Sequence, residues 1–190
     1  MPLRSCLLLA LLALVGCDSG ANNPRVEMVT NKGPVTIELF ESKAPGTVKN
    51  FLAYVDDKHF DGTIFHRVIN GFMIQGGGFK PDMKAELPAR EPIKNEATNG
   101  LKNDRGTLAM ARTNDPHSAT AQFFINVKDN DVLNHRGQNP QDWGYCVFGQ
   151  VVGGMDIVDK IRRVSTTTKE GHENVPVDDV VIESIRRVAK

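Results

Sequence analysis

Alternation of apolar and polar residues predicts a chain built mostly from short strands. Val35, Ile37 and Leu39 alternate with polar or small neighbours, the period of a half-buried strand. Residues 25–30 precede them across Asn31-Lys32-Gly33, so this region is predicted to form a hairpin. The same reasoning predicts further strands, which cover residues 63–69, 72–75, 108–112, 123–127, 146–151 and 180–188. Asn70-Gly71 separates the first two of these and favours a tight hairpin turn.

Two segments have the periodicity of helices instead. Residues 44–57 begin with Pro45, which suits a first turn, and their apolar face is formed by Val48, Phe51, Leu52 and Val55. Residues 155–164 repeat the pattern with Met155, Val158 and Ile161. Residues 76–105 are long, irregular and rich in Gly, Pro and charge, and segments of this kind are often functional. This inventory predicts a mainly β barrel or sandwich with two helices outside it or at its ends.

The first 16 residues have the organisation of a secretory signal peptide. Arg4 precedes an apolar run from Leu7 to Val15. The run has the length of a signal-peptide core and is shorter than the roughly 20 apolar residues that span a bilayer. A buried strand or helix end is the alternative, and the abrupt loss of hydrophobicity after the run disfavours it. We therefore divide the chain into a signal peptide (1–16), a tether (17–24) and one globular domain (25–190).

The apolar run ends in Leu14-Val15-Gly16-Cys17, which resembles the lipobox of bacterial lipoproteins. In such proteins the cysteine becomes the first residue and carries the lipid. The resemblance implies a periplasmic protein anchored to a membrane through Cys17, with the following residues as a flexible tether. Asp18 resembles an inner-membrane retention signal. Ordinary signal cleavage near residues 19–21 remains the alternative.

Composition narrows the classes of protein to which the chain can belong. Its 190 residues are 40% hydrophobic and 24% charged, as in an ordinary globular domain. Lys and Arg number 23, and Asp and Glu also number 23. The basic excess of most nucleic-acid-binding proteins is therefore missing, and no nucleic-acid partner is expected. Cys146 is the one thiol left in the predicted mature domain, and a small buried hydrophobe is favoured over a nucleophile.

The motifs of several enzyme classes are missing from the sequence. It contains no G-x-S-x-G or H-E-x-x-H motif, and Gly76-Gly77-Gly78 lacks the Lys-Ser/Thr of a phosphate-binding loop. The triglycine is therefore interpreted as a turn rather than an anion site. The five histidines are dispersed without metal-ligand spacing, so neither a metal nor a cofactor is expected. Arg67 stands among strand-like apolar residues, where a guanidinium is costly to bury unless its donors are used. A structural and a functional role both fit it.

The segment FHRVINGFMIQGG, residues 65–77, resembles the signature of the cyclophilin family of peptidyl-prolyl cis-trans isomerases. Three further segments agree in the same order, namely GTLAMAR (106–112), SATAQFFIN (118–126) and WGYCVFG (143–149). The last of these is typical of the bacterial branch. The resemblance implies a closed antiparallel eight-stranded barrel with two capping helices. It also implies a monomer without cofactor that acts on proline-containing polypeptides.

The resemblance also implies a set of site residues. Arg67 matches the family's catalytic arginine, and Gln75 joins it in the catalytic set. The residues expected to bind substrate or border the proline pocket are Phe65, Phe72, Met73, Ala111, Arg112, Gln122, Phe124, Leu133 and Tyr145. Three positions depart from the eukaryotic pattern: Val132 replaces a frequent aromatic residue, Tyr145 a His, and Arg112 an Asn. Val132 puts cyclosporin sensitivity in doubt.

These residue types suit an isomerisation that needs no nucleophile. The barrier to amide rotation, about 18–20 kcal/mol, comes from resonance. In the twisted transition state the prolyl nitrogen regains its lone pair, so an arginine can donate to it more strongly than in the planar ground state. Arg67 would make this contact beside an apolar pocket for the proline ring. The alternative is a binding module that captures proline-containing segments as a chaperone, with incidental turnover; an unrelated hydrolase has no motif in its favour.

Overall fold

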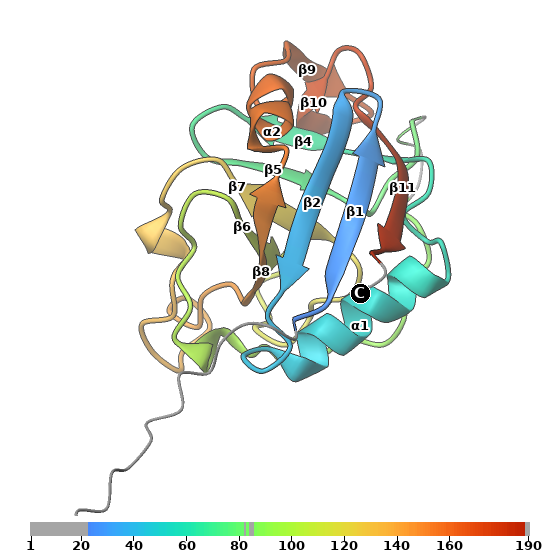
Figure 1. Ribbon diagram of the computed structural model, residues 1–190. Helices are drawn as coiled ribbons and strands as arrows, with labels where there is room; N and C mark the ends of the chain where they lie inside the picture. The colour runs from blue at the N-terminus through green and yellow to red at the C-terminus, as the bar shows by residue number, and fades with distance from the viewer. Residues whose placement is uncertain (1–22, 82, 84–85, 189–190) are drawn as a thin grey trace, which may run out of the picture.

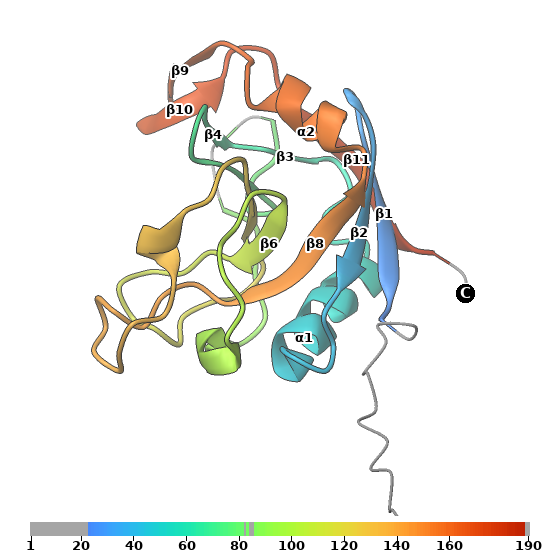
Figure 2. The same ribbon diagram turned by 60° about the vertical axis from the view of Figure 1, so that its left-hand side comes forward.

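The computed structural model describes residues 23–81, 83 and 86–188. Its main feature is an antiparallel sheet that curls around an apolar core (Figures 1 and 2). The strand order is β3-β11-β1-β2-β8-β6-β7-β5-β4. The strands of this sheet are β1 (Arg25–Thr30), β2 (Gly33–Leu39), β3 (Thr63–Ile64), β4 (Arg67–Ile69), β5 (Met73–Gly76), β6 (Thr107–Met110), β7 (Phe123–Asn126), β8 (Val147–Gly153) and β11 (Val181–Arg187). The predicted mainly β class is confirmed, as is the hairpin at the start of the domain.

The main sheet has nine strands rather than the eight expected. The difference arises in residues 63–69, which form two short strands, β3 and β4, instead of one. Phe65 and His66 separate them, and the Phe65 N–H donates to the carbonyl of Val180 at 2.9 Å. Because β3 and β4 are the two edge strands, one chain segment links both edges of the curled sheet.

Two helices pack against this sheet (Figure 1). They are α1 (Pro45–Asp56), which begins with the predicted proline, and α2 (Met155–Ile161), which ends three residues before its predicted boundary at 164. The Glu96 carboxylate accepts hydrogen bonds from the N–H groups of Gly46 and Thr47 at 3.1 and 2.8 Å. This contact satisfies donors that a helix start leaves unpaired, and it places a negative charge where the helix dipole favours one.

The core lies between the concave face of the sheet and α1. Phe51 projects from α1 into a group of aromatic rings and meets Phe123 edge-on, with ring centroids 5.6 Å apart. Phe60 and Phe148 each lie 5.2 Å from the same ring. Cys146 is buried in this core, as expected for a small hydrophobe, and burial raises the pKa of its thiol to about 11.

A second sheet was not predicted. It is a hairpin of β9 (Thr166–Lys169) and β10 (His172–Pro176), which packs beside β4. Two short 3₁₀ helices, η1 (Ala97–Asn99) and η2 (Asp131–Leu133), complete the fold. None of the described helices is both long and apolar enough to cross a bilayer. The expected signal peptide and Cys17 lie outside the described residues.

Candidate active site

The site is built on three neighbouring strands whose side chains are sorted by their register. Arg67 on β4 lies opposite Gln75 on β5, and Gln75 lies opposite Phe124 on β7. Residues directly opposite one another project from the same face of a sheet. The intervening row, Val68, Ile74 and Ile125, points into the main core. The alternation therefore places one cation, one amide and one aromatic ring together on the outer face.

These residues form one side of an apolar pocket. Its base contains buried Met73 and Phe124, which pack in a hydrophobic cluster separate from the main core. The pocket has a volume of about 100 Å³, well below the roughly 300–1,000 Å³ of drug-sized ligand sites, so it suits a single small ring. The full lining is Arg67, Phe72, Met73, Gln75, Ala111, Arg112, Phe124, Leu133 and Tyr145.

The far wall of the pocket is stiffened by stacked side chains. Tyr145 meets Phe124 edge-on, with centroids 5.7 Å apart, and the Arg112 guanidinium lies 4.6 Å from the centre of the Tyr145 ring. Arg112 also donates to the carbonyls of Gly144 and Pro140 at 3.1 and 3.2 Å. These contacts of the Arg112 guanidinium hold the far wall of the pocket in place. The two departures from the eukaryotic pattern, Arg112 and Tyr145, occur as a packed pair.

A chain of side-chain amides orients Arg67. The guanidinium donates from one Nη to Gln75 Oε1 at 3.5 Å, and Gln75 Nε2 donates to Gln122 Oε1 at 2.8 Å. Gln122 in turn donates to the carboxylate of Glu86. Gln75 therefore acts on the arginine, and Gln122 acts on Gln75. The other Arg67 donors are directed to no hydrogen-bond acceptor among the described residues.

Buried asparagines hold the pocket wall from behind. Asn103 Nδ2 donates to the carbonyls of Leu133 and Tyr145 at 3.1 and 3.3 Å. Asn130 Nδ2 donates to the carbonyl of Phe72 at 2.8 Å. Asn126 joins the two, because its Nδ2 donates to Asn103 Oδ1 and its Oδ1 accepts from Asn130. All three carboxamides are at most 2% exposed, and together they fix the backbone of three pocket residues.

The structure separates one predicted site residue from the rest. Phe65 is fully buried in the main core and does not line the pocket. Simple alternation placed it on the same face as Arg67, and the break between β3 and β4 removes that relation. Gln122 lies beside the pocket rather than in its wall, where it contacts Gln75. Val132 is 71% exposed and is not among the residues that line the pocket.

His66 is the strongly perturbed titratable group beside the site. It is 5% exposed, and its Nδ1 has no hydrogen-bond partner among the described residues. Burial lowers its pKa to about 4, and the nearby charges of His172 and Arg67 act in the same direction. No cluster of three metal-ligating side chains occurs within residues 23–188 as the structure describes them. The chemistry at hand is therefore hydrogen-bond donation beside an apolar pocket.

Comparisons with known proteins assign the family. A model for cyclophilin type peptidyl-prolyl cis-trans isomerases matches residues 25–187. Peptidyl-prolyl cis-trans isomerase B of Escherichia coli K12 is 64% identical over 156 residues, which is 82% of this chain and 94% of that protein. Peptidyl-prolyl cis-trans isomerase A of Dickeya dadantii is 48% identical over 182 residues, covering 96% of this chain and 94% of that protein.

Solved structures agree with the sequence comparisons. The crystal structure of a cyclophilin type peptidyl-prolyl cis-trans isomerase from Cryptosporidium parvum matches with a TM-score of 0.73. It is 28% identical, and the match covers 89% of this chain and 99% of that one. The structure determined in the presence of the dipeptide Ala-Pro matches with a TM-score of 0.71. The curled β fold, the pocket and these matches thus all point to one class of enzyme, the isomerases of X-Pro bonds. The chain belongs to the cyclophilin family and is a peptidyl-prolyl cis-trans isomerase.

Replacing Asn103 tests whether the asparagines position the pocket. In Asn103→Ala the carbonyls of Leu133 and Tyr145 lose the hydrogen bonds from the Asn103 carboxamide, so we expect the unfolding free energy to fall by about 1–3 kcal/mol. The wall should loosen, which raises KM for a proline peptide more than it lowers kcat. Denaturant unfolding and exchange kinetics measure both effects. Exposed Asn114→Ala is the control, and unchanged KM in a folded Asn103→Ala protein would refute the positioning role.

The lowered pKa of His66 predicts a pH dependence of stability. Its folded pKa of about 4 lies below its usual 6.5, so the unfolded chain binds the proton more tightly. This contribution is complete above pH 6.5 and is lost as the pH falls toward 4, amounting to roughly 3 kcal/mol at most. Denaturant unfolding at several pH values between 4 and 7 gives the unfolding free energy as a function of pH. This free energy should change less steeply with pH in His66→Gln than in the native protein. Equal slopes for both proteins would contradict this interpretation.

Proposed function

We propose that the protein accelerates rotation about X-Pro bonds in exported polypeptides, with Arg67 as the catalytic donor. One observation carries the mechanism: the Arg67 guanidinium stands at the edge of an apolar pocket, held on one side by Gln75. A proline ring in the pocket would bring its nitrogen toward the arginine. The apolar walls would hold the ring while the preceding residues rotate.

Arg67 would stabilise the transition state more than the substrate. In the planar amide the prolyl nitrogen is a poor acceptor, because its lone pair is shared with the carbonyl. Twisting restores the lone pair, and the guanidinium then donates to it. An interaction that strengthens only in the transition state raises the rate without tightening substrate binding to the same extent. Each tenfold acceleration requires about 1.4 kcal/mol of such a difference.

Gln75 and Gln122 would act by orienting the donor. The relay from Glu86 through Gln122 to Gln75 restricts the guanidinium before substrate binds. A donor that is already oriented avoids reorganisation during the reaction, which is the main advantage of an enzyme site over water. Ala111 borders the pocket beside Arg112, and its backbone would hold the segment that precedes the proline. No step requires a covalent intermediate.

Substitution of Arg67 tests the mechanism directly. We expect Arg67→Lys to lose at least about tenfold in kcat/KM, because a lysine lacks the fixed planar fork of donors. Exchange NMR on a short Xaa-Pro peptide would compare it with the native protein and with exposed Arg163→Lys as a matched control. Circular dichroism would confirm that all three are folded.

Each result of the exchange experiment separates two mechanisms. Near-native turnover by Arg67→Lys and Arg67→Ala would retain the isomerase and discard arginine donation. Peptide binding without acceleration by the native protein would favour the capture module over the enzyme. Loss of rate in both variants with retained binding supports the proposed role of Arg67.

We also propose that Cys17 carries a lipid that holds the domain at a periplasmic membrane surface. The support is the Leu14-Val15-Gly16-Cys17 sequence after an apolar run, together with a short polar segment before β1. Several acyl chains anchor firmly, since each buried CH₂ contributes about 0.8 kcal/mol. A tether of this length leaves the isomerase domain close to the bilayer, where exported chains emerge.

Replacement of Cys17 tests the anchor independently of catalysis. In bacterial cells, Cys17→Ser should move the protein from the membrane to the soluble fraction and abolish labelling by a palmitate analogue. Cys6→Ser is the control, since Cys6 lies within the predicted signal peptide. Density separation of membranes would show whether Asp18 directs the protein to the inner membrane. Unchanged fractionation and labelling of Cys17→Ser would refute lipidation there.

A further inference from the structure

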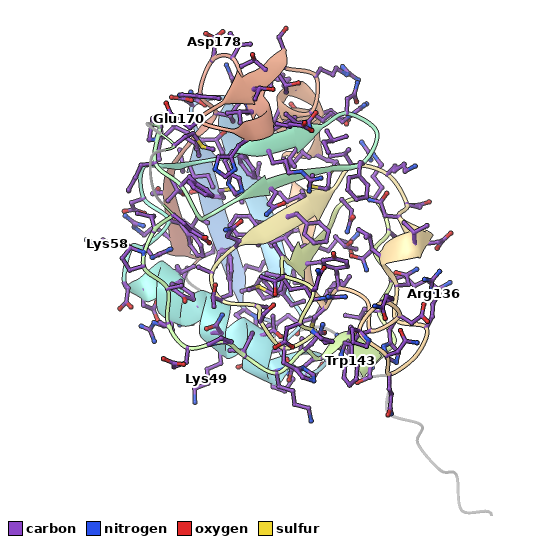
Figure 3. The ribbon with its side chains drawn as sticks, turned by 180° about the vertical axis from the view of Figure 1, so that it is seen from behind. Lys49, Lys58, Arg136, Trp143, Glu170 and Asp178 are labelled. Atoms are coloured by element: carbon purple, nitrogen blue, oxygen red, sulfur yellow. The ribbon has the colours of Figure 1, made fainter. Side chains whose placement is uncertain are left out.

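The β9–β10 hairpin, which sequence patterns did not predict, is fastened beside the active site. Val175 of β10 is fully buried in a small apolar cluster with Ile64 and Phe79. Lys169 of β9 donates to the carbonyl of Pro81 at 2.7 Å and lies 3.6 Å from a carboxylate oxygen of Asp179. Viewed from behind, the hairpin lies next to β4, and Glu170 marks its turn (Figure 3).

A bulge in this hairpin directs polar residues toward β4. Pairing shifts between His172 and Val175, so Glu173 and Asn174 lie outside the regular ladder. Asn174 adopts a φ of 61°, a left-handed conformation that costs energy for any residue other than glycine. Bulges often re-aim side chains beside functional sites. Here the bulge presents His172, Glu173 and Asn174 to the same cavity.

That cavity is a groove of about 570 Å³, much larger than the proline pocket. It shares Arg67 and Gln75 with the pocket, so the two are continuous. The Phe79 ring lies along it between two histidines, 4.8 Å from the His66 ring and 5.1 Å from the His172 ring. A groove of this size accommodates several residues of an extended chain.

The groove is lined by two carboxylates and two guanidinium groups, and a basic ligand is favoured only where the hairpin contributes Glu173. Glu86 and Glu173 both line it, and neither forms an ion pair with any residue in the described part of the chain. Of the two lining arginines, Arg112 is engaged with backbone carbonyls, and Arg67 is turned toward Gln75. The hairpin side of the groove therefore presents carboxylate without a matching cation.

We propose that this groove is a subsite for the residues that follow the proline, and that it selects Lys or Arg among them. The inference rests on the proposed function, in which the preceding segment lies over Ala111. Ala111 lines an adjoining groove, with Thr113, Ser118 and Thr120, and is absent from this one. Glu86 borders both grooves, whereas Glu173 lines only this one. The chain that leaves the pocket past Arg67 is thus the following segment, and its side chains meet Glu173.

The test is a peptide series measured with the full chain. Peptides of the form Ala-Ala-Pro followed by three residues would carry Lys, Glu or Ala at one of those three positions. Exchange NMR gives kcat/KM, and chemical-shift titration gives Kd. At one position we expect Lys to exceed Glu by about threefold in kcat/KM and in affinity, the factor of an exposed ion pair. The ratio should fall toward one in 1 M salt, where the Debye length is about 3 Å.

The variant Glu173→Gln should remove most of the Lys-to-Glu ratio, whereas Glu183→Gln, an exposed carboxylate of β11 outside the groove, should keep it. A ratio near one at all three positions, or a ratio unchanged by Glu173→Gln, overturns the subsite. Failure to accelerate the all-Ala peptide instead overturns the proposed function. The affinity ratio still decides the subsite in that case. Melting temperatures of the two variants show whether either substitution disturbs the fold.

Discussion

The register of β5 against its two neighbours, β4 and β7, is the constraint on which the site depends. Successive side chains of a strand point to opposite faces, so a shift of one residue would exchange the faces completely. Arg67 and Gln75 would enter the core, while Val68 and Ile74 would face solvent. Burying an unpaired guanidinium costs far more than a lost apolar contact. Burial of the apolar row therefore fixes the register of these strands. The fixed register in turn sets the positions of Arg67 and Gln75 on the other face.

The pocket wall also has support from behind, and apolar packing supplies only part of it. The pocket residues Phe72 and Leu133 come from a turn and a 3₁₀ helix, neither of which has a ladder of backbone hydrogen bonds. Two buried asparagines replace that ladder, since the carboxamides of Asn103 and Asn130 donate to backbone carbonyls of the wall. Within a low-dielectric interior such hydrogen bonds are strengthened and favour one arrangement of the backbone. The pocket is thus held rigid by polar hydrogen bonds behind it, although the surface that it presents is apolar.

The sequence predicted those parts of the fold that follow from local periodicity. The first hairpin, the apolar face of α1 and the strand positions of the core were all within its reach, because each shows a regular pattern. The β9–β10 hairpin was missed because β9 reads Thr-Thr-Thr-Lys, with side chains that are mostly exposed and do not alternate. Its one strong anchor, Val175, becomes visible only when Phe79 and Ile64 are brought beside it.

The candidate site divides in the same way. The pocket residues were identified by their resemblance to a known family. Such a resemblance gives the roles of residues but does not explain how folding brings them together. Phe65 lies in the core rather than in the pocket, because residues 63–69 do not form one continuous strand: β3 ends at Ile64 and β4 begins at Arg67. The asparagines carried no signal, since a polar residue in a loop normally indicates a turn rather than a buried carboxamide. The carbonyls of Leu133 and Tyr145, which are twelve residues apart, must converge on Asn103 before its carboxamide has a role.

An isomerisation that breaks no bond depends strongly on the rigidity of the pocket. A nucleophilic enzyme can draw on a covalent intermediate, but rotation about an amide offers only the difference between two shapes of the same molecule. In the proposed mechanism the pocket holds the ring still while Arg67 donates to the prolyl nitrogen as the amide twists. A wall that moved with the substrate would stabilise planar and twisted forms equally and would leave the barrier unchanged. The stacked Arg112 and Tyr145, the amide relay and the asparagine network all act against that motion. Most of the polar hydrogen bonding near the site therefore serves to keep the pocket in one shape, and the proposed mechanism assigns only the Arg67 guanidinium to the reaction itself.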